Sequence, residues 1–197
     1  MAEVAYELTM VAGAEAPATD GPVHLSVAGL RKTFGADLTV LKDIGFVLRA
    51  GEAVALIGAN GTGKSTLLRC CLRLIEPDKG EISLLGEDIR GLSRRGLRRL
   101  RSRIGFVFQK HNLVPRLSAL TNVLHGVLGR EGGPRYWFHS LAPQLARDEA
   151  LHCLDQVGLA DIADRRVDRL SGGQSQRVAI ARALMQRPEI VIADEPA

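Results

Sequence analysis

"GANGTGKST", residues 58–66, matches the pattern G-x-x-x-x-G-K-[ST], and the rest of the chain is interpreted outward from it. The apolar run before it, residues 53–57, predicts a strand buried on both faces. The apolar residues after it recur at helical spacing and predict a helix that Pro77 and Gly80 end. Glycines let the backbone between the two curl with its N–H groups inward, and a helix start adds a positive dipole end. The sequence therefore predicts an α/β chain with a loop that cradles phosphate groups.

Two side chains at the end of this loop have chemistry that suits a nucleotide. Lys64 supplies a mobile cation for the β- and γ-phosphates, and Ser65 offers a hydroxyl to Mg²⁺. A glycine-rich turn with a chance lysine is the alternative, and the position of the motif between strand and helix disfavours it.

The last stretch, "EIVIADEPA" at residues 189–197, carries two adjacent carboxylates at the end of an apolar run. Beside a phosphate loop, a buried parallel strand typically delivers an aspartate to the magnesium site, which makes Asp194 the candidate Mg²⁺ ligand. Glu195 is then the candidate base, or orienting group, for the attacking water. The alternative is an exposed strand end without a role.

A second candidate anion site is "LSGGQSQR", residues 170–177. Ser171 is predicted to cap a helix that runs to Gln186, and Gly172 and Gly173 allow close approach to its positive end. The phosphate loop already accounts for one ligand, so this site requires another ligand or the nucleotide of a second copy. A plain capped helix is the alternative.

Elsewhere, alternating apolar residues predict β-strands at 24–30, 38–41 and 44–48, with turns at Gly35 and Gly45. Further strands are predicted at 105–108 and 190–193, and residues 113–168 are predicted to be mostly helical. Strands that alternate with helices favour a parallel sheet. Residues 1–22 are rich in Ala, Pro and acids and are predicted to form a loose tail.

The net charge of +4 is local, because seven arginines lie within residues 90–103 with no acid among them. Without them the chain is net negative, which argues against a nucleic-acid binder. Residues 93–103 are predicted to be helical, with Leu97, Leu100 and Ile104 facing inward. The arginines form either a solvated face or a patch for nucleic acid or lipid headgroups.

Composition also bears on compartment. Three cysteines without a C-x-x-C pair favour buried, reduced thiols over a metal site or disulfide framework. The first 22 residues contain no Lys or Arg, which argues against a secretory signal. The longest charge-free run is too short and too polar to cross a membrane.

In this order and spacing, the loop, Gln109 at the end of "IGFVFQ", "LSGGQSQR" and "IVIADE" resemble the ATP-binding cassette (ABC) ATPases over about residues 23–197. The resemblance implies a P-loop NTPase: a RecA-like core with an antiparallel β subdomain at 23–112 and 170–197, and an inserted helical subdomain at 113–169. It also implies that Phe34 stacks on adenine, with a core position as the alternative, and that Gln109 senses the γ-phosphate and Mg²⁺.

The site residues implied by the resemblance fall into three groups. The catalytic residues are Lys64, Gln109 and Glu195, and the metal ligands are Ser65, Gln109 and Asp194. The nucleotide-binding residues are Phe34, Gly58, Asn60, Gly61, Thr62, Gly63, Lys64, Ser65, Thr66, Ser171, Gly172, Gly173 and Gln174.

The cofactors implied are ATP and Mg²⁺, and the partners are a second ATPase subunit, integral-membrane permease subunits and, indirectly, an extracytoplasmic solute-binding protein, with no nucleic acid. The implied location is peripheral, at the cytoplasmic face of the plasma (inner) membrane. Two stretches, residues 109–130 and 166–197, resemble the ATPase of phosphonate importers in particular. The expected function is therefore to energise import of phosphonate or a related oxyanion.

The insertion that carries Tyr136, Trp137 and Phe138 is open to two interpretations, an exposed cluster that meets a partner or a small local core. The family pattern continues past Glu195 with a Leu-Asp pair and a strand that ends in histidine, whereas all five histidines here precede Asp194. We therefore expect an N-terminal fragment without the C-terminal strands, from a truncated gene or an incomplete sequence.

Two other functions remain open at this stage. One is an ATP-binding fragment without turnover. The other is a soluble ABC ATPase of DNA repair or translation, which the lack of long coiled coils and of a second cassette disfavours.

Overall fold

The computed structural model describes residues 9–12, 21–109 and 111–194. The chain divides into two compact units, Met1–Leu97 and Arg98–Ala197. This division is by compactness and differs from the predicted division into an ATPase core and a helical subdomain, which stays a prediction. Among the described residues, no helix has both the length and the apolar character that a bilayer crossing requires.

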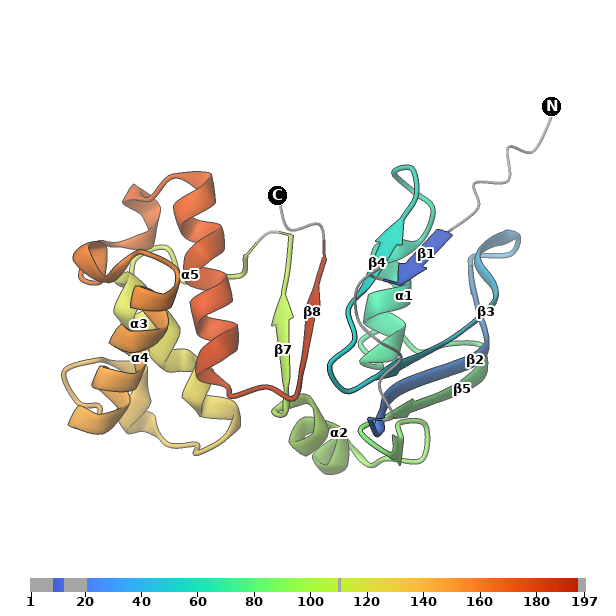
Figure 1. Cartoon of the computed structure of the whole chain (residues 1–197), viewed down its shortest axis with the longest axis horizontal. Helices are drawn as coiled ribbons and strands as arrows, with labels where there is room; N and C mark the ends of the chain where they lie inside the picture. The colour runs from blue at the N-terminus through green and yellow to red at the C-terminus, as the bar shows by residue number, and fades with distance from the viewer. Residues whose placement is uncertain (1–8, 13–20, 110, 195–197) are drawn as a thin grey trace. The chain divides into compact units, whose positions relative to one another are not determined.

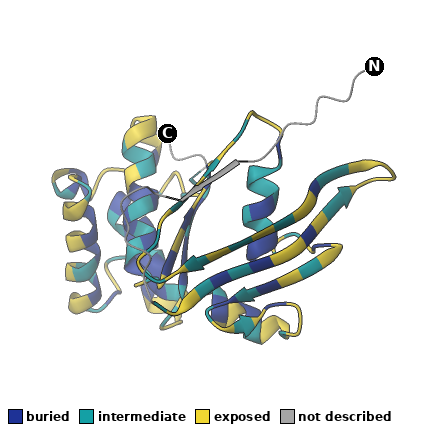
Figure 2. Ribbon diagram, turned by 45° about the vertical axis from the view of Figure 1, so that its right-hand side comes forward, coloured by how far each residue is buried: buried dark blue, intermediate teal, exposed yellow. Residues whose placement is uncertain are grey.

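The N-terminal unit contains a four-stranded antiparallel sheet in the order β3-β2-β5-β6. Leu25, Val27 and Leu30 are buried and are separated by half-buried or exposed residues, a mixed pattern that Figure 2 shows along the long strands. The antiparallel β subdomain that the sequence led us to expect is thus present. Its strands are β2 (Val23–Phe34), β3 (Leu38–Arg49), β5 (Lys79–Leu84) and β6 (Glu87–Asp88).

One of the two predicted turns in this sheet is present. Gly35 has a φ of 63° and lies in the turn between β2 and β3. Gly45 lies inside β3 instead, because an irregular register accommodates Asp43, which has a φ of 57°, without reversing the chain. The two short strands predicted at 38–41 and 44–48 are therefore one continuous strand.

The phosphate-loop motif follows β4 (Val54–Ile57) and leads into α1 (Lys64–Cys71), as predicted. Residues 1–22 were predicted to form a loose tail, but four of them form strand β1 (Thr9–Ala12). This strand pairs with β4 in antiparallel fashion (Figure 1). Within the N-terminal unit Ile57 is 54% exposed, and burial of β4 on both faces stays a prediction.

Helix α1 is shorter than its apolar pattern predicts. Arg73 has a φ of 51°, and its guanidinium donates to the backbone carbonyls of Ile89 and Leu92 at 2.9 and 3.0 Å. These bonds hold the chain out of helical geometry just after Cys71, before Pro77 is reached.

The two cysteines of α1, Cys70 and Cys71, are free and buried, as predicted.

Helix α2 (Arg94–Arg101) spans the boundary between the two units and forms where the arginine-rich segment predicts a helix. Leu97, Leu100 and Ile104 are 8%, 1% and 2% exposed, which confirms that this apolar side faces inward.

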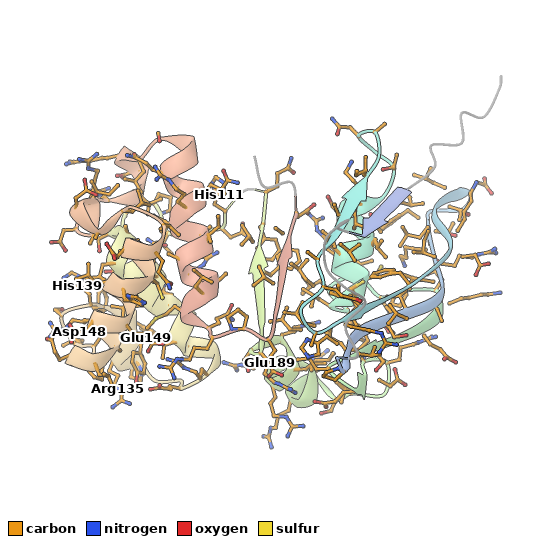
Figure 3. The ribbon with its side chains drawn as sticks, viewed as in Figure 1. His111, Arg135, His139, Asp148, Glu149 and Glu189 are labelled. Carbon is orange, nitrogen blue, oxygen red and sulfur yellow. The ribbon has the colours of Figure 1, made fainter. Side chains whose placement is uncertain are left out.

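The C-terminal unit contains the parallel pair of β7 (Ile104–Val107) and β8 (Ile190–Ala193), which confirms the predicted parallel pairing for these strands. An ion pair joins their starting ends, since Arg103 donates to both carboxylate oxygens of Glu189 at 2.6 and 3.0 Å. Figure 3 labels Glu189 at this end of the pair.

A helical cluster packs beside this strand pair (Figure 1), with α5 in contact with β7 through Val107, Ala179 and Ala183. As the sequence predicts, residues 113–168 are mostly helical. The helices are α3 (Ala119–Leu124), α4 (Gln144–Gln156) and α5 (Gly172–Met185), with 3₁₀ turns η1 (His125–Gly129), η2 (Pro134–Trp137), η3 (Ala160–Ile162) and η4 (Val167–Arg169).

Candidate functional site

The loop between β4 and α1 is folded back on itself by hydrogen bonds. The Lys64 ammonium donates to the carbonyls of Gly58 and Ala59 at 2.8 and 3.0 Å, which places the cation over the loop. The Thr62 hydroxyl also donates to the Ala59 carbonyl, at 2.9 Å. The lysine thus lies where an anion held by the loop would meet it.

Two glycines of this loop adopt backbone conformations that other residues rarely adopt. Gly61 has a φ of 86° and Gly63 a φ of 95°. Gly63 is also the N-cap of α1, and no side chain among the described residues caps this helix. Because the first amides of a helix have no acceptor within it, this end of α1 is suited to bind an anion. Asn60 is exposed, whereas Ser65 and Thr66 are half-buried in the first turn of α1.

The carboxyl end of the β7–β8 pair holds two of the predicted site residues. Asp194 directly follows β8, its side chain is 2% exposed, and its N–H donates to the Val107 carbonyl at 3.0 Å. Gln109 follows β7 by two residues and is exposed. Parallel strands end at the same edge, so the register brings both residues to that edge. Glu195 lies outside the described residues.

Gln109 sits in a turn that is held from several sides. The N–H of His111 donates to the Phe108 carbonyl at 2.8 Å and closes the turn around Gln109. Two residues that the sequence analysis did not single out hold the chain that follows, Arg182 on α5 and Asn122 on α3. Their polar character amid the apolar residues of α5 and α3 is a sequence signal, but it does not indicate which backbone groups they bind.

The start of α5 has the predicted cap. The Ser171 hydroxyl accepts from the Gln174 N–H at 3.2 Å, and the Gln174 side chain accepts from the Ser171 N–H at 2.9 Å. Gly172 and Gly173 are exposed, and a Cβ atom on either would meet nothing within 4 Å in the described part of the chain. Crowding inside this chain therefore does not require either glycine, and the space over the helix end is open.

The structure places Phe34 at the end of β2 with its side chain 39% exposed, so it is not a core residue. The Lys32 ammonium lies 5.5 Å from the centre of the ring. The predicted site residues are divided between the two units. Phe34 and residues 58–66 belong to the N-terminal unit, whereas Gln109, Asp194 and residues 171–174 belong to the C-terminal unit.

The aromatic residues of the insertion, 136–138, were open to two interpretations, a small local core or an exposed cluster that meets a partner. One of the three is buried and two are exposed. Tyr136 is 1% exposed in the core of the helical cluster, and its hydroxyl donates to Glu131. Trp137 and Phe138 are 57% and 52% exposed.

Comparisons with known proteins agree with these motifs. The family model described as ABC transporter matches residues 41–197. The phosphonates import ATP-binding protein PhnC of Nitratidesulfovibrio vulgaris is 53% identical over 176 residues, which are 89% of this chain and 66% of that protein. PhnC 2 of a Synechococcus species is 48% identical over 172 residues, 87% of this chain and 64% of that protein. The chain thus spans about two thirds of the length of the curated relatives it matches.

Among solved structures, the dimeric ATP-binding cassette MJ0796 in a post-hydrolysis state with ADP and Pi superposes with a TM-score of 0.75 at 33% identity. The match covers 88% of this chain and 74% of that one. This likeness bears out the predicted P-loop NTPase fold. Since the family model covers most of the chain and includes the phosphate loop, residues 171–174 and Asp194, the chain belongs to the ABC transporter family.

Proposed function

We propose that this chain binds ATP with Mg²⁺ and is the ATPase subunit of an importer. The observation that carries the proposal is the loop at residues 58–66, where the Lys64 ammonium lies over a backbone turn and the uncapped start of α1 follows. This combination of a cation with the positive end of a helix suits a polyphosphate. The relatives' names and the ADP and Pi in the MJ0796 cassette support the same ligand class.

The residues fit a magnesium ion in their chemistry. Mg²⁺ prefers oxygen ligands, and Ser65, Gln109 and Asp194 offer a hydroxyl, an amide and a carboxylate. A carboxylate as buried as that of Asp194, at 2% exposure, is typically stabilised by a cation or by hydrogen bonds. When bound, the ion would neutralise charge on the phosphates.

The remaining roles follow from what each side chain can do. Lys64 would pair with the β- and γ-phosphates, Phe34 would stack on the base with its exposed ring, and Glu195 would accept a proton from the attacking water. Residues 171–174 would meet the nucleotide of a second copy, which the open space over Gly172 and Gly173 supports. The proposed assembly is a homodimer at the cytoplasmic face of the plasma membrane, bound to permease subunits and indirectly to a solute-binding protein.

Phosphonate or a related oxyanion is the proposed solute, supported by the 53% and 48% identity to phosphonate import proteins. Deletion of the gene should abolish growth on methylphosphonate as the sole phosphorus source and leave growth on phosphate intact. Undiminished growth on methylphosphonate would argue against this solute but not against ATP binding.

The nucleotide site itself is tested by Lys64→Ala. We expect loss of ATP binding in isothermal titration calorimetry, because the cation that faces the phosphates is removed. Lys79→Ala, an exposed lysine on β5, is the matched control and should bind ATP with wild-type affinity. Wild-type affinity in Lys64→Ala would refute the assignment of the loop.

The catalytic step is tested by Glu195→Gln, which keeps the size of the side chain and removes the base. ATP binding should persist, hydrolysis should fall at least about a hundredfold, and a dimer should accumulate in ATP on size-exclusion chromatography. Full turnover in this variant would rule out Glu195 as the base.

A further inference from the structure

The turn that carries Gln109 is attached to the helix that begins at Ser171. Arg182, on α5, donates from one terminal nitrogen to the Asn112 carbonyl at 2.7 Å and from the other to the His111 carbonyl at 2.8 Å. The N–H of His111 in turn closes the Gln109 turn on Phe108 at 2.8 Å. One planar guanidinium therefore holds two successive carbonyls next to Gln109, and Figure 3 shows His111 between α5 and the β7–β8 pair.

The backbone that Arg182 holds is in an unusual conformation. His111 and Asn112 have φ angles of 54° and 48°, in the left-handed region that non-glycine residues rarely adopt. Two adjacent residues in this region persist only where contacts enforce them. The rigid fork of the guanidinium is suited to do so, because its two donors have a fixed spacing that an ammonium group lacks.

Arg182 is half-buried, and partial burial lowers the pKa of its guanidinium. A partly desolvated donor that loses its acceptor is costly, so the two carbonyls and the arginine are expected to move together.

A second anchor ties the same segment to α3. Asn122 is fully buried, its side-chain oxygen accepts from the Val114 N–H at 2.7 Å, and its amide donates to the carbonyls of Val114 and Ser118 at 3.1 and 3.0 Å. Leu113 packs against Val107 and the alanines of α5. The segment after Gln109 is therefore fixed to the helical cluster as well as to β7.

We propose that Arg182 is a positioning residue that couples the orientation of Gln109 to the position of α5. Arg182 lies eleven positions after Ser171, so a rigid helix of about 16 Å joins the cap to the arginine. A shift of α5 at its Ser171 end is carried by Arg182 to the carbonyls of His111 and Asn112 and so to the Gln109 turn. The catalytic meaning rests on the proposed function, in which Gln109 contacts Mg²⁺ and residues 171–174 contact nucleotide.

The coupling is tested without nucleotide by amide hydrogen exchange of residues 111–117. Ser171→Ala removes the cap of α5 and should raise exchange in this segment about threefold or more when Arg182 is present. The reason is that motion of the destabilised helix is transmitted through the Arg182 hydrogen bonds to the turn. In the Arg182→Lys background, exchange should already be about tenfold faster, and Ser171→Ala should add nothing. Unchanged exchange on decapping, or equal effects in both backgrounds, would overturn the coupling whether or not the chain binds ATP.

A kinetic arm addresses the role of Gln109. Arg182→Lys should lower kcat for ATP hydrolysis about tenfold with KM within about twofold, and should have no further effect on kcat in the Gln109→Ala background. Arg187→Lys, an exposed arginine just past α5 that pairs with Glu149, is the matched control and should leave kcat unchanged. Additive losses in the double variant would show that Arg182 acts on the fold and not through Gln109. If the wild-type chain hydrolyses no ATP, the proposed function fails while the exchange measurement still decides the coupling.

Discussion

Gly63 lies so close to Val40 that a Cβ atom on Gly63 would come within 2.7 Å of Cγ1 of Val40. Val40 belongs to β3, so this strand lies directly against the residue that precedes α1. Gly63 also has a φ of 95°, which an L-residue with a side chain rarely adopts. Two independent constraints, contact and backbone angle, therefore require glycine at the point where α1 begins.

We expect Gly63→Ala to destabilise the chain by about 2–4 kcal/mol, as the sum of backbone strain and steric overlap. Urea unfolding followed by circular dichroism measures this loss. ATP affinity should fall in parallel, because the start of α1 is displaced from the loop.

Gly61→Ala separates the two constraints. Gly61 has a φ of 86°, but a Cβ atom there meets nothing within 4 Å in the described part of the chain. Only the backbone penalty of about 1–2 kcal/mol is expected. Equal losses in the two variants would show that the contact with Val40 does not constrain Gly63.

The sequence predicted those features that depend on local pattern. The loop at residues 58–66, the Ser171 cap and the positions of strands β7 and β8 follow from residue types at short spacing. The ends of α1 and the course of β3 at Gly45 did not, because Arg73 and Asp43 adopt positive φ angles that pattern alone does not reveal. For Arg73, the guanidinium bonds that accompany this angle reach carbonyls 16 and 19 residues away.

The candidate site shows the same division. The identities of Lys64, Gln109 and Asp194 were predictable from motifs, whereas the arginine that holds the Gln109 turn was not. Arg182 lies 70 and 71 residues from its two acceptors, and no local spacing indicates such a contact. The pairing of β1 with β4 was not predicted either, because residues 9–12 show no clear alternation that would indicate a strand.

Ser171→Ala should reduce the free energy of unfolding by about 1 kcal/mol, because the Ser171 hydroxyl satisfies an amide of the first turn of α5. Chemical denaturation measures the change. Ser171→Thr keeps the hydroxyl and is the matched control, with a loss of only a few tenths of a kcal/mol. Identical stabilities of the Ala and Thr variants would mean that the cap does not stabilise α5.

The stability of the helical cluster should depend on pH through Glu149. Burial raises the pKa of this carboxyl, but hydrogen bonds from Arg187 and Arg130 outweigh it and hold the pKa below its ordinary value of 4.5. A depressed pKa in the folded state contributes stability that is fully present above pH 4.5 and is lost as the pH falls through the folded-state pKa. We therefore expect the urea midpoint to decrease as the pH falls below 4.5.

Glu149→Gln should remove part of this decrease, so its midpoint should change less between pH 5 and pH 3 than that of the wild type. Asp148→Asn is the matched control, because the Asp148 carboxylate, also on α4, accepts from the Gln144 amide instead of from arginines. If Asp148→Asn flattens the profile as much as Glu149→Gln does, the arginine pairs of Glu149 are not the cause.

The thiols of Cys70 and Cys71 should be nearly inert in the folded chain. Burial raises the pKa of Cys70 to about 11 and that of Cys71 to about 12, from an ordinary value of 9.0. Because the thiolate is the reactive form, iodoacetamide at pH 8 should label them at least about a hundredfold more slowly in the folded than in the urea-unfolded chain. A Cys153→Ser background restricts the count to this pair, and mass spectrometry of the labelled peptide measures it. Since both thiols lie on α1, the helix that begins at Lys64, equal labelling rates in the two states would show that this helix is not packed as described.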